Sequence, residues 1–150
     1  MSDKRVLTIN AGSSSIKFAL FDSATRRLDG QIERLGTGSA TLRYRDVATG
    51  ERGEHKLSAG DVQTAVRALT EWLRSHVGIA SVQAIGHRVV HGMNRLEPEI
   101  VTDALLADLH RIEAFAPDHL PAELRLIEAF RDDDARRLQV ACFDTVFHQS

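Results

Sequence analysis

The sequence predicts an α/β fold in which an N-terminal β-meander precedes alternating helices and strands. In the first 57 residues, short apolar runs are separated by turns rich in Gly and Ser. From residue 62 onward, apolar residues recur at three- and four-residue spacing, and strand-like apolar runs return at 82–90 and 138–143. Strands that alternate with helices in this way indicate an α/β sheet.

The meander begins with a predicted β-hairpin. Apolar residues at 6–9 and 16–21 flank the turn Gly12-Ser13-Ser14-Ser15, and two apolar runs around such a turn are typical of paired strands. Three further strands are expected around residues 32–35, 41–47 and 54–57.

The first predicted helix follows a change of pattern at Ser58. Ser58 with Asp61 resembles a capping box, in which side chains and backbone N–H groups satisfy each other at a helix start. Apolar residues then continue along one face to His76, and Gly78 ends the helix. A buried strand over 82–90 comes next.

Two more helices and a strand complete the expected order. Thr102 is placed to cap a helix that carries Leu105 and Leu109, and Pro117 breaks this helix. A further helix is expected to begin near Pro121. Residues 138–143 form the last expected strand.

The composition excludes several classes of protein. The chain has 150 residues, of which 43% are apolar and 27% charged, and this balance is typical of one globular domain. Its 19 basic and 21 acidic residues give a net charge of −2, which argues against a dedicated nucleic-acid-binding protein. No apolar run exceeds four residues, so no membrane span is expected. The single cysteine, Cys142, fits a reducing, cytoplasmic setting.

The segment from Asn10 to Lys17 concentrates hydrogen-bond donors in a tight turn. Gly12 lets the backbone bend, and the serine hydroxyl groups, with the turn N–H groups, can surround an anion. Lys17 adds a compact positive charge, and it is one of only three lysines among the 19 basic residues. An ordinary polar hairpin turn is an equally good interpretation on residue chemistry alone. A nucleotide P-loop is excluded because the sequence contains no Gly-Lys pair.

A second cluster, Gly86-His87-Arg88-Val89-Val90-His91-Gly92, is predicted to lie on a strand. Four strand residues span about 13 Å, so His87 and His91 are too far apart to bind one zinc ion. Alternation places Arg88 and Val90 on one face of the strand and His87 on the other. An arginine on a buried strand needs an anionic partner, which is either a structural carboxylate or a substrate.

The third cluster is the end of the last predicted strand. Asp144 directly follows Val140-Ala141-Cys142-Phe143, and ligands of α/β sheets gather at the carboxyl ends of strands. An Asp that caps the next loop or helix is the alternative. His119 lies in a loop between two prolines, and a lone loop histidine is usually solvated. Cys142 is most simply a small core residue. A hydrolase nucleophile elbow is excluded because no Gly-x-Ser-x-Gly occurs.

Taken together, these clusters resemble the signatures of the acetate kinase family. Residues 6–18 read Val-Leu-Thr-Ile-Asn-Ala-Gly-Ser-Ser-Ser-Ile-Lys-Phe, where the family has Val-Leu-x-Ile-Asn-Ala-Gly-Ser-Ser-Ser-x-Lys-Phe. The family's Gly-His-Arg-Val-Val-His-Gly is complete at 86–92, and its Phe-Asp-Thr-x-Phe-His-Gln occupies 143–149. Three long motifs in the same order make the resemblance specific. The resemblance covers the N-terminal portion of a two-domain family, so we expect residues 1–150 to be the N-terminal domain of an acyl kinase.

The resemblance implies the ribonuclease H-like, actin-like α/β fold that acetate and sugar kinases share with actin. It implies reversible transfer of the γ-phosphoryl group of ATP to acetate or another short-chain carboxylate, with Mg²⁺, to give an acyl phosphate and ADP. The family's nucleotide-binding domain is C-terminal, so the 150-residue chain alone is expected to be inactive. A homodimer of the full-length protein is also implied.

The resemblance assigns roles to eight residues. Those on the metal and phosphate side are Asn10, which is associated with the metal, and Ser13, Ser15 and Lys17, which bind the phosphates of ATP. On the acyl side, Arg88 binds the carboxylate and is catalytic, and Val90 lines the acyl pocket. His119 and Asp144 are the other catalytic residues. Acetate is already ionised at neutral pH, so we expect Asp144 to organise Mg²⁺, water or Arg88 instead of accepting a proton.

Three positions depart from the family's pattern. Met93 stands where the family has a second glycine. On the two sides of His119, Asp118 stands where the family has a leucine and Leu120 where it has an asparagine. We expect Asp118 to point away from the acyl pocket and to cap the turn or helix near Pro121. Two alternatives to an acetate kinase remain: a non-catalytic anion-binding or assembly domain that keeps the fold, and a relative that acts on another carboxylate.

Overall fold

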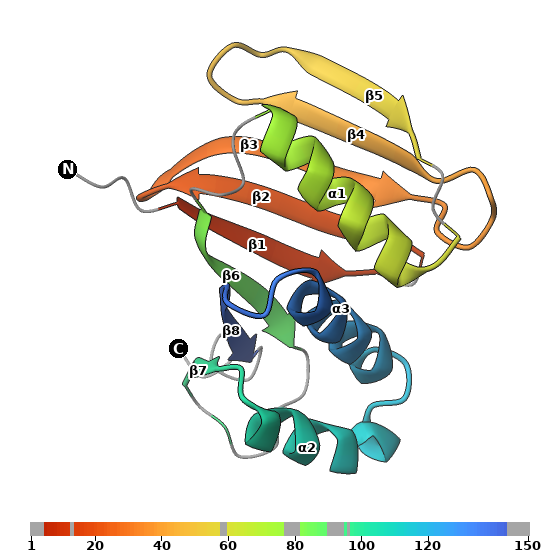
Figure 1. Ribbon diagram of the computed structural model, residues 1–150, viewed down its shortest axis with the longest axis vertical. Helices are drawn as coiled ribbons and strands as arrows, with labels where there is room; N and C mark the ends of the chain where they lie inside the picture. Colours follow the sequence, from red (N-terminus) through yellow and green to blue (C-terminus); the bar gives the residue numbers. More distant parts are fainter. Residues whose placement is uncertain are drawn as a thin grey trace.

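The structure is a mixed β-sheet with helices packed on one of its faces (Figure 1). This computed structural model describes residues 5–12, 14–57, 60–76, 82–89, 95 and 97–143. Within these residues, the strands pair in the order β5-β4-β3-β2-β1-β6-β8-β7.

The element bounds follow the chain order. The strands are β1 (Arg5–Ala11), β2 (Ile16–Asp22), β3 (Thr25–Glu33), β4 (Thr41–Asp46), β5 (Arg52–Lys56), β6 (Val82–Val89), β7 (Glu99–Ile100) and β8 (Leu138–Phe143). The helices are α1 (Val62–His76), α2 (Asp103–Arg111), the short 3-10 helix η2 (Glu113–Phe115) and α3 (Leu120–Asp133).

The sheet has an antiparallel half and a parallel half. Strands β1 to β5 form the meander, in which each strand pairs antiparallel with the next. Strand β6 then pairs parallel with β1, and β8 pairs parallel with β6. The two-residue β7 adds an antiparallel edge to β8. The carboxyl ends of β1, β6 and β8 therefore lie at the same end of the sheet.

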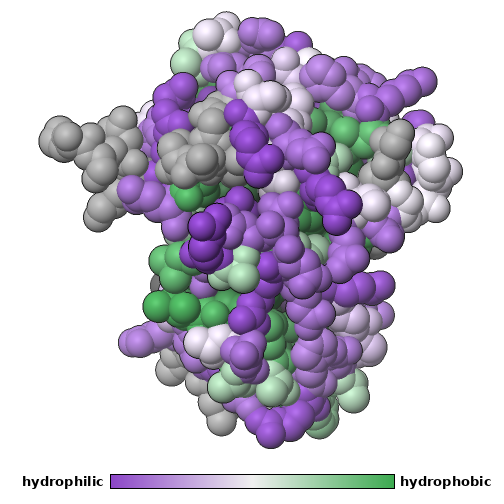
Figure 2. Space-filling model, viewed as in Figure 1, coloured by the Kyte–Doolittle hydropathy of each residue, from purple (hydrophilic) through white to green (hydrophobic). Residues whose placement is uncertain are grey.

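Side chains that point toward the helices form two hydrophobic cores. One lies between the meander and α1 and includes Leu7, Ile32 and Leu69, which are fully buried. The other joins β6 and β8 to α2 and α3 and includes Val89 and Phe143. Figure 2 shows the helix-covered side of the molecule, on which hydrophilic residues predominate.

The opposite side of the sheet is here called the open face. It carries the side chains that alternate with the buried ones, and among them are Thr8, Asn10, Lys17, Arg43, Arg45 and Arg88. In β1 and β6, for example, Ile9 and His87 are paired and buried, and their neighbours Thr8 and Arg88 are exposed. Alternation along a strand thus separates a helix-packed set of residues from a solvent-facing set.

The structure confirms the predicted order of strands and helices, and the cap at Thr102. The Thr102 side chain accepts a hydrogen bond from the backbone N–H of Leu105, 3.1 Å away, at the start of α2. Helix α1 ends at His76 and α3 begins at Leu120, with Pro121 in its first turn.

The predicted pairing of Ser58 with Asp61 involves a residue outside the described ranges. At the start of α1, Asp61 Oδ1 accepts from the Thr64 N–H at 2.8 Å, and Thr64 Oγ1 accepts from the Asp61 N–H at 3.2 Å. Two other details of the prediction are wrong. Leu35 lies beyond β3, because Arg34 has a φ of 61° and turns the chain out of the sheet. Strand β7 was not expected.

Among the described residues, no helix combines the length and the apolar character that crossing a membrane requires.

Candidate active site at the carboxyl ends of the parallel strands

The parallel register brings two of the expected site residues to the same end and the same face of the sheet. Ile9 of β1 pairs with His87 of β6, so Asn10 and Arg88 each come one residue later on neighbouring strands. Both side chains point to the open face, because Ile9, His87 and Val89 alternate with them and are buried. Arg88 in turn pairs with Cys142 of β8. Asp144 directly follows β8 but lies outside the described residues, as do Ser13 and Val90.

The turn between β1 and β2 is closed by backbone hydrogen bonds. The Gly12 N–H donates to the Ser15 carbonyl at 2.8 Å, and the Leu35 N–H donates to the Ser14 carbonyl at 3.0 Å. A Cβ on Gly12 would lie 2.4 Å from Ser15 Oγ, so a side chain at position 12 would displace the Ser15 hydroxyl. The turn therefore holds the half-buried Ser15 hydroxyl at the end of β1.

Lys17 lies beside Asn10 and forms part of a cationic hollow on the open face. The two residues are paired across β1 and β2. The hollow has a volume of about 940 Å³ and extends from these strands to β5. Its lining carries five basic residues, Lys17, Arg26, Arg43, Arg45 and Arg52, against two acidic residues, Asp29 and Glu54. Arg26 and Arg45 form ion pairs with Asp29, and Arg43 forms one with Glu54. The remaining excess of positive charge along the hollow favours an anionic ligand.

Arg88 differs in one respect from the expectation. The sequence predicts an arginine on a buried strand, and the structure exposes it. The reason is that, among the described residues, the helices pack on the face of β6 that carries Ile85, His87 and Val89 and not on the face that carries Arg88. Cys142, expected in the core, is half-buried on the open face beside Arg88, and this burial raises the pKa of its thiol.

His119 reaches the same end of the sheet through α3. Helix α3 connects to the start of the parallel strand β8, so it runs back along the sheet and its first turn lies near the strand carboxyl ends. Leu120, the residue after His119, belongs to one core cluster with Val89 and Phe143, the last residues of β6 and β8. His119 occupies the N-cap position and is exposed, and its side chain does not cap the helix.

Asp118 is exposed on the same loop, next to His119. The expected orientation away from the acyl pocket is not tested by the described residues, because Val90 lies outside them.

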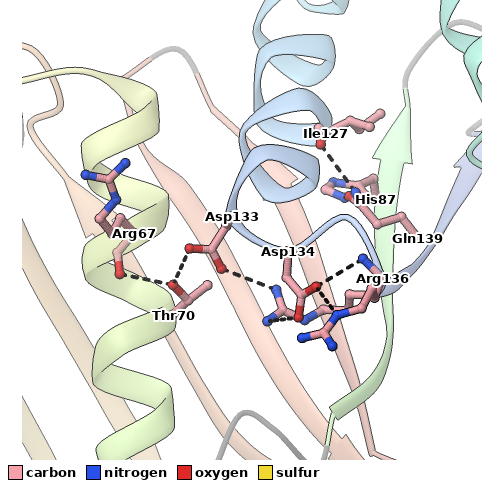
Figure 3. A network of polar contacts seen from close by, with 9 residues as sticks. Arg67, Thr70, His87, Ile127, Asp133, Asp134, Arg136 and Gln139 are labelled. Atoms are coloured by element: carbon pink, nitrogen blue, oxygen red, sulfur yellow. Dashed lines mark hydrogen bonds and ion pairs between the residues drawn. The ribbon is translucent and has the colours of Figure 1, made fainter.

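The first histidine of the strand cluster is buried and neutral. His87 is 2% exposed, and its burial lowers the pKa of the ring to about 4. The ring nitrogen Nε2 lies 2.5 Å from Gln139 Oε1, and Gln139 Nε2 donates to the Ile127 carbonyl at 3.4 Å (Figure 3). Within the described residues, no three His, Cys, Asp or Glu side chains form a metal-binding group.

Gln139 is a buried polar residue that the sequence motifs do not identify. It is 4% exposed and lies on the helix-facing side of β8. The signal that could have found it is a polar residue at an inward position of an apolar strand, because such a residue needs a hydrogen-bond partner inside the protein.

Known proteins agree with this fold and this motif order. The sequence pattern of the Acetokinase family matches residues 5–150. The chain is 40% identical to the acetate kinase of Streptomyces avermitilis, over 99% of this chain and 38% of that protein. It is 36% identical to an acetate kinase of Listeria monocytogenes, over 98% of this chain and 38% of that protein.

Solved structures give the same result. The propionate kinase from Francisella tularensis superposes with a TM-score of 0.88 at 29% identity, over 98% of this chain and 38% of that one. The acetate kinase of Porphyromonas gingivalis superposes with a TM-score of 0.88 at 27% identity, over 98% of this chain and 39% of that one.

The fold is therefore the actin-like α/β fold of the acyl kinases. The chain belongs to the Acetokinase family, and it spans about 38% of the length of the curated relatives that it matches.

Proposed function

We propose that this chain supplies the carboxylate- and phosphate-binding side of an acyl kinase, which transfers the γ-phosphoryl group of ATP reversibly to acetate or another short-chain carboxylate. The observation that carries the proposal is that Asn10 and Arg88 share the open face at the end of the sheet where the turn after β1 begins. These groups come from neighbouring strands, and their donors and charges are those that phosphoryl transfer requires.

Arg88 is the group that binds the acyl carboxylate in this proposal. A planar guanidinium can hold the two oxygens of a carboxylate and stabilise the charge that develops on the transferred phosphoryl group. Val90, two residues later, gives an apolar wall for a small acyl chain. His119 and Asp144 complete the catalytic set, with His119 donating to the phosphoryl group and Asp144 orienting Arg88, water or Mg²⁺.

The phosphate side consists of Ser13, Ser15 and Lys17. Hydroxyl groups and a point positive charge suit the oxygens of a polyphosphate. Lys17 lies on the open face beside Asn10, within the cationic hollow. The local charge therefore attracts ATP phosphates to the strand ends.

Asn10 is the described residue that fits Mg²⁺. Its side chain offers an amide oxygen, is half-buried and lies beside Lys17. Mg²⁺ prefers oxygen ligands, keeps several waters and is bound by one or two protein groups together with substrate phosphates. Asn10 with Asp144 would hold it in this way, and the ion would neutralise phosphate charge when bound.

The remaining parts of the proposal concern the whole protein. The adenosine site is assigned to the part of the relatives that this chain does not match, so residues 1–150 form an N-terminal domain. A cytoplasmic location and a homodimer belong to the same proposal. The 150-residue chain, assayed alone, is expected to show no turnover, because none of the described residues closes over the hollow to exclude water.

The test is a direct assay of the purified full-length protein that carries this chain. ATP, Mg²⁺ and either acetate or propionate are mixed with it, and both ADP and acyl phosphate are measured. Carboxylate-dependent formation of both products supports the proposal. Binding of phosphates without any acyl phosphate would contradict it and favour a non-catalytic anion-binding domain.

A further inference from the structure

Arg88 has a buried neighbour that the proposed reaction does not use. His87 precedes it on β6, and its side chain points to the opposite face, where it is 2% exposed. The ring packs edge-on against Phe130 of α3, with the ring centroids 5.6 Å apart. A polar ring in such surroundings is costly unless its nitrogens are hydrogen-bonded.

The hydrogen bonds of His87 form a short directed chain. Gln139 Oε1 can only accept, so His87 Nε2 carries the proton and donates across 2.5 Å. The amide nitrogen of Gln139 then donates to the carbonyl oxygen of Ile127 at 3.4 Å. Because burial lowers the pKa of His87 to about 4, the ring stays neutral at physiological pH and keeps this single-donor form.

The chain of hydrogen bonds crosses three elements. It begins on β6 beside Arg88, passes through β8 and ends on the main chain of α3 (Figure 3). Helix α3 is the element whose N-cap residue is His119. The link therefore joins the strand that carries the arginine to the helix that begins at the catalytic histidine.

A catalytic role for His87 itself is excluded by its direction. Its ring lies in the layer between sheet and helix, whereas Asn10 and Arg88 point to the open face. A substrate on that face is separated from the ring by the strand. His87 also belongs to no cluster of metal-binding side chains within the described ranges.

We propose that His87 is a positioning residue: through Gln139 it fixes β6 against β8 and α3, and so sets where the Arg88 guanidinium stands relative to the His119 loop. This inference rests on the proposed function, because it assigns Arg88 and His119 to one substrate. Such placement matters because a displacement of about 1 Å in a bound group can lower the rate about 100-fold.

The test compares two substitutions of His87 in the full-length protein. His87→Phe keeps a ring against Phe130 but removes the donor. His87→Gln provides an amide N–H that can replace the ring Nε2–H as the donor to Gln139 Oε1. We expect His87→Phe to raise the KM for the carboxylate and lower kcat, with a combined loss in kcat/KM of about 30-fold or more. The KM for ATP should stay within about 2-fold, and His87→Gln should recover most of the loss.

Thr70→Val is the matched control. Thr70 is fully buried, and its hydroxyl donates to Asp133 Oδ1 at 3.3 Å, so it links α1 to the last turn of the same helix α3 (Figure 3). This variant also removes a buried polar contact, but at the end of α3 away from His119. It should lower the melting temperature without changing the KM for the carboxylate.

A second variant separates positioning from stability. In His87→Phe with Gln139→Leu, both polar partners are replaced, which restores much of the lost stability because no buried acceptor is left unpaired. The loss in kcat/KM for the carboxylate should persist.

The positioning role alone would be overturned if the wild type is active and the KM for the carboxylate is equal in His87→Phe and Thr70→Val. A wild type without carboxylate kinase activity would overturn the proposed function and this inference with it. If His87→Phe gives no folded protein, Gln139→Leu, which keeps the ring and removes its acceptor, is judged by the same criterion.

Discussion

The backbone N–H of Gly12 donates to the Ser15 carbonyl oxygen at 2.8 Å, and the glycine leaves only enough room for the Ser15 hydroxyl. A Cβ at position 12 would lie 2.4 Å from that hydroxyl oxygen. The atom that must move is the end of a short side chain, which can rotate without disturbing the strands. Gly12 therefore controls the position of a phosphate-binding hydroxyl more than it controls stability.

The first prediction concerns this pair. Gly12→Ala should lower kcat/KM for ATP about 10-fold. This is less than the roughly 100-fold or larger cost of removing a transition-state hydrogen-bond donor, because the hydroxyl is displaced and not removed. The melting temperature should change little. Steady-state kinetics with varied ATP, together with thermal unfolding, measure both quantities.

Ser15→Ala is the control for Gly12→Ala. If both substitutions act on one hydroxyl, the kcat/KM of the double variant for ATP should equal that of the less active single variant. Losses that add in the double variant would show that Gly12 acts through another part of the turn.

The second prediction concerns Arg88. Arg88→Lys in the full-length protein should lower kcat/KM for acetate by at least about 100-fold, because a point charge cannot replace a planar fork that holds two oxygens. Arg52→Lys is the matched control, since Arg52 is an exposed arginine at the far end of the cationic hollow. An unchanged kcat/KM in Arg88→Lys would show that Arg88 is structural.

The third prediction concerns pH and His110. The ring of His110 contacts Glu128 Oε1 at 2.5 Å through Nε2 and Glu113 through Nδ1, so it ties α2 to α3 and η2. The hydrogen bond to Glu128, and then that to Glu113, raises the pKa of His110. A raised pKa in the folded state means that the stabilisation is complete below the unfolded value of about 6.5 and is lost as the pH rises through the folded value.

His110→Gln should therefore lower the melting temperature by a few degrees at pH 5.5, and the difference from wild type should shrink by pH 8.5. The effect is small because the His110 side chain is 45% exposed and solvent screens the ion pair. Glu128→Gln should reproduce the same pH dependence. A difference between wild type and His110→Gln that stays constant across this pH range would contradict the assignment.

Much of the fold follows from local sequence signals. Three of these signals each extend over a few residues. They are the Thr102 cap, the spacing of Ala65, Leu69 and Leu73 along α1, and the alternation of Ile85, His87 and Val89 along β6. Such signals depend on backbone geometry that repeats every 3.6 or 2 residues. They also placed Arg88 and His87 on opposite faces of β6.

The errors arise where distant contacts decide. Strand β7 has two residues, too few for any period, and exists because Ile100 pairs with Val140. Alternation gave the face of Arg88 but not its exposure, because exposure depends on whether another layer covers that face.

The last prediction concerns Asp118, the carboxylate beside His119. If Asp118 faced the acyl pocket about 4 Å from the substrate carboxylate, repulsion would cost about 4 kcal/mol at an effective dielectric constant near 20. Asp118→Leu would then raise kcat/KM for acetate and propionate by several hundred-fold. Asp118 is exposed, so we expect a change of about 2-fold or less for both substrates, as for an ordinary surface substitution. A large gain for both would mean that the carboxylate faces the pocket and that the natural substrate carries a hydroxyl or a cation to pair with it.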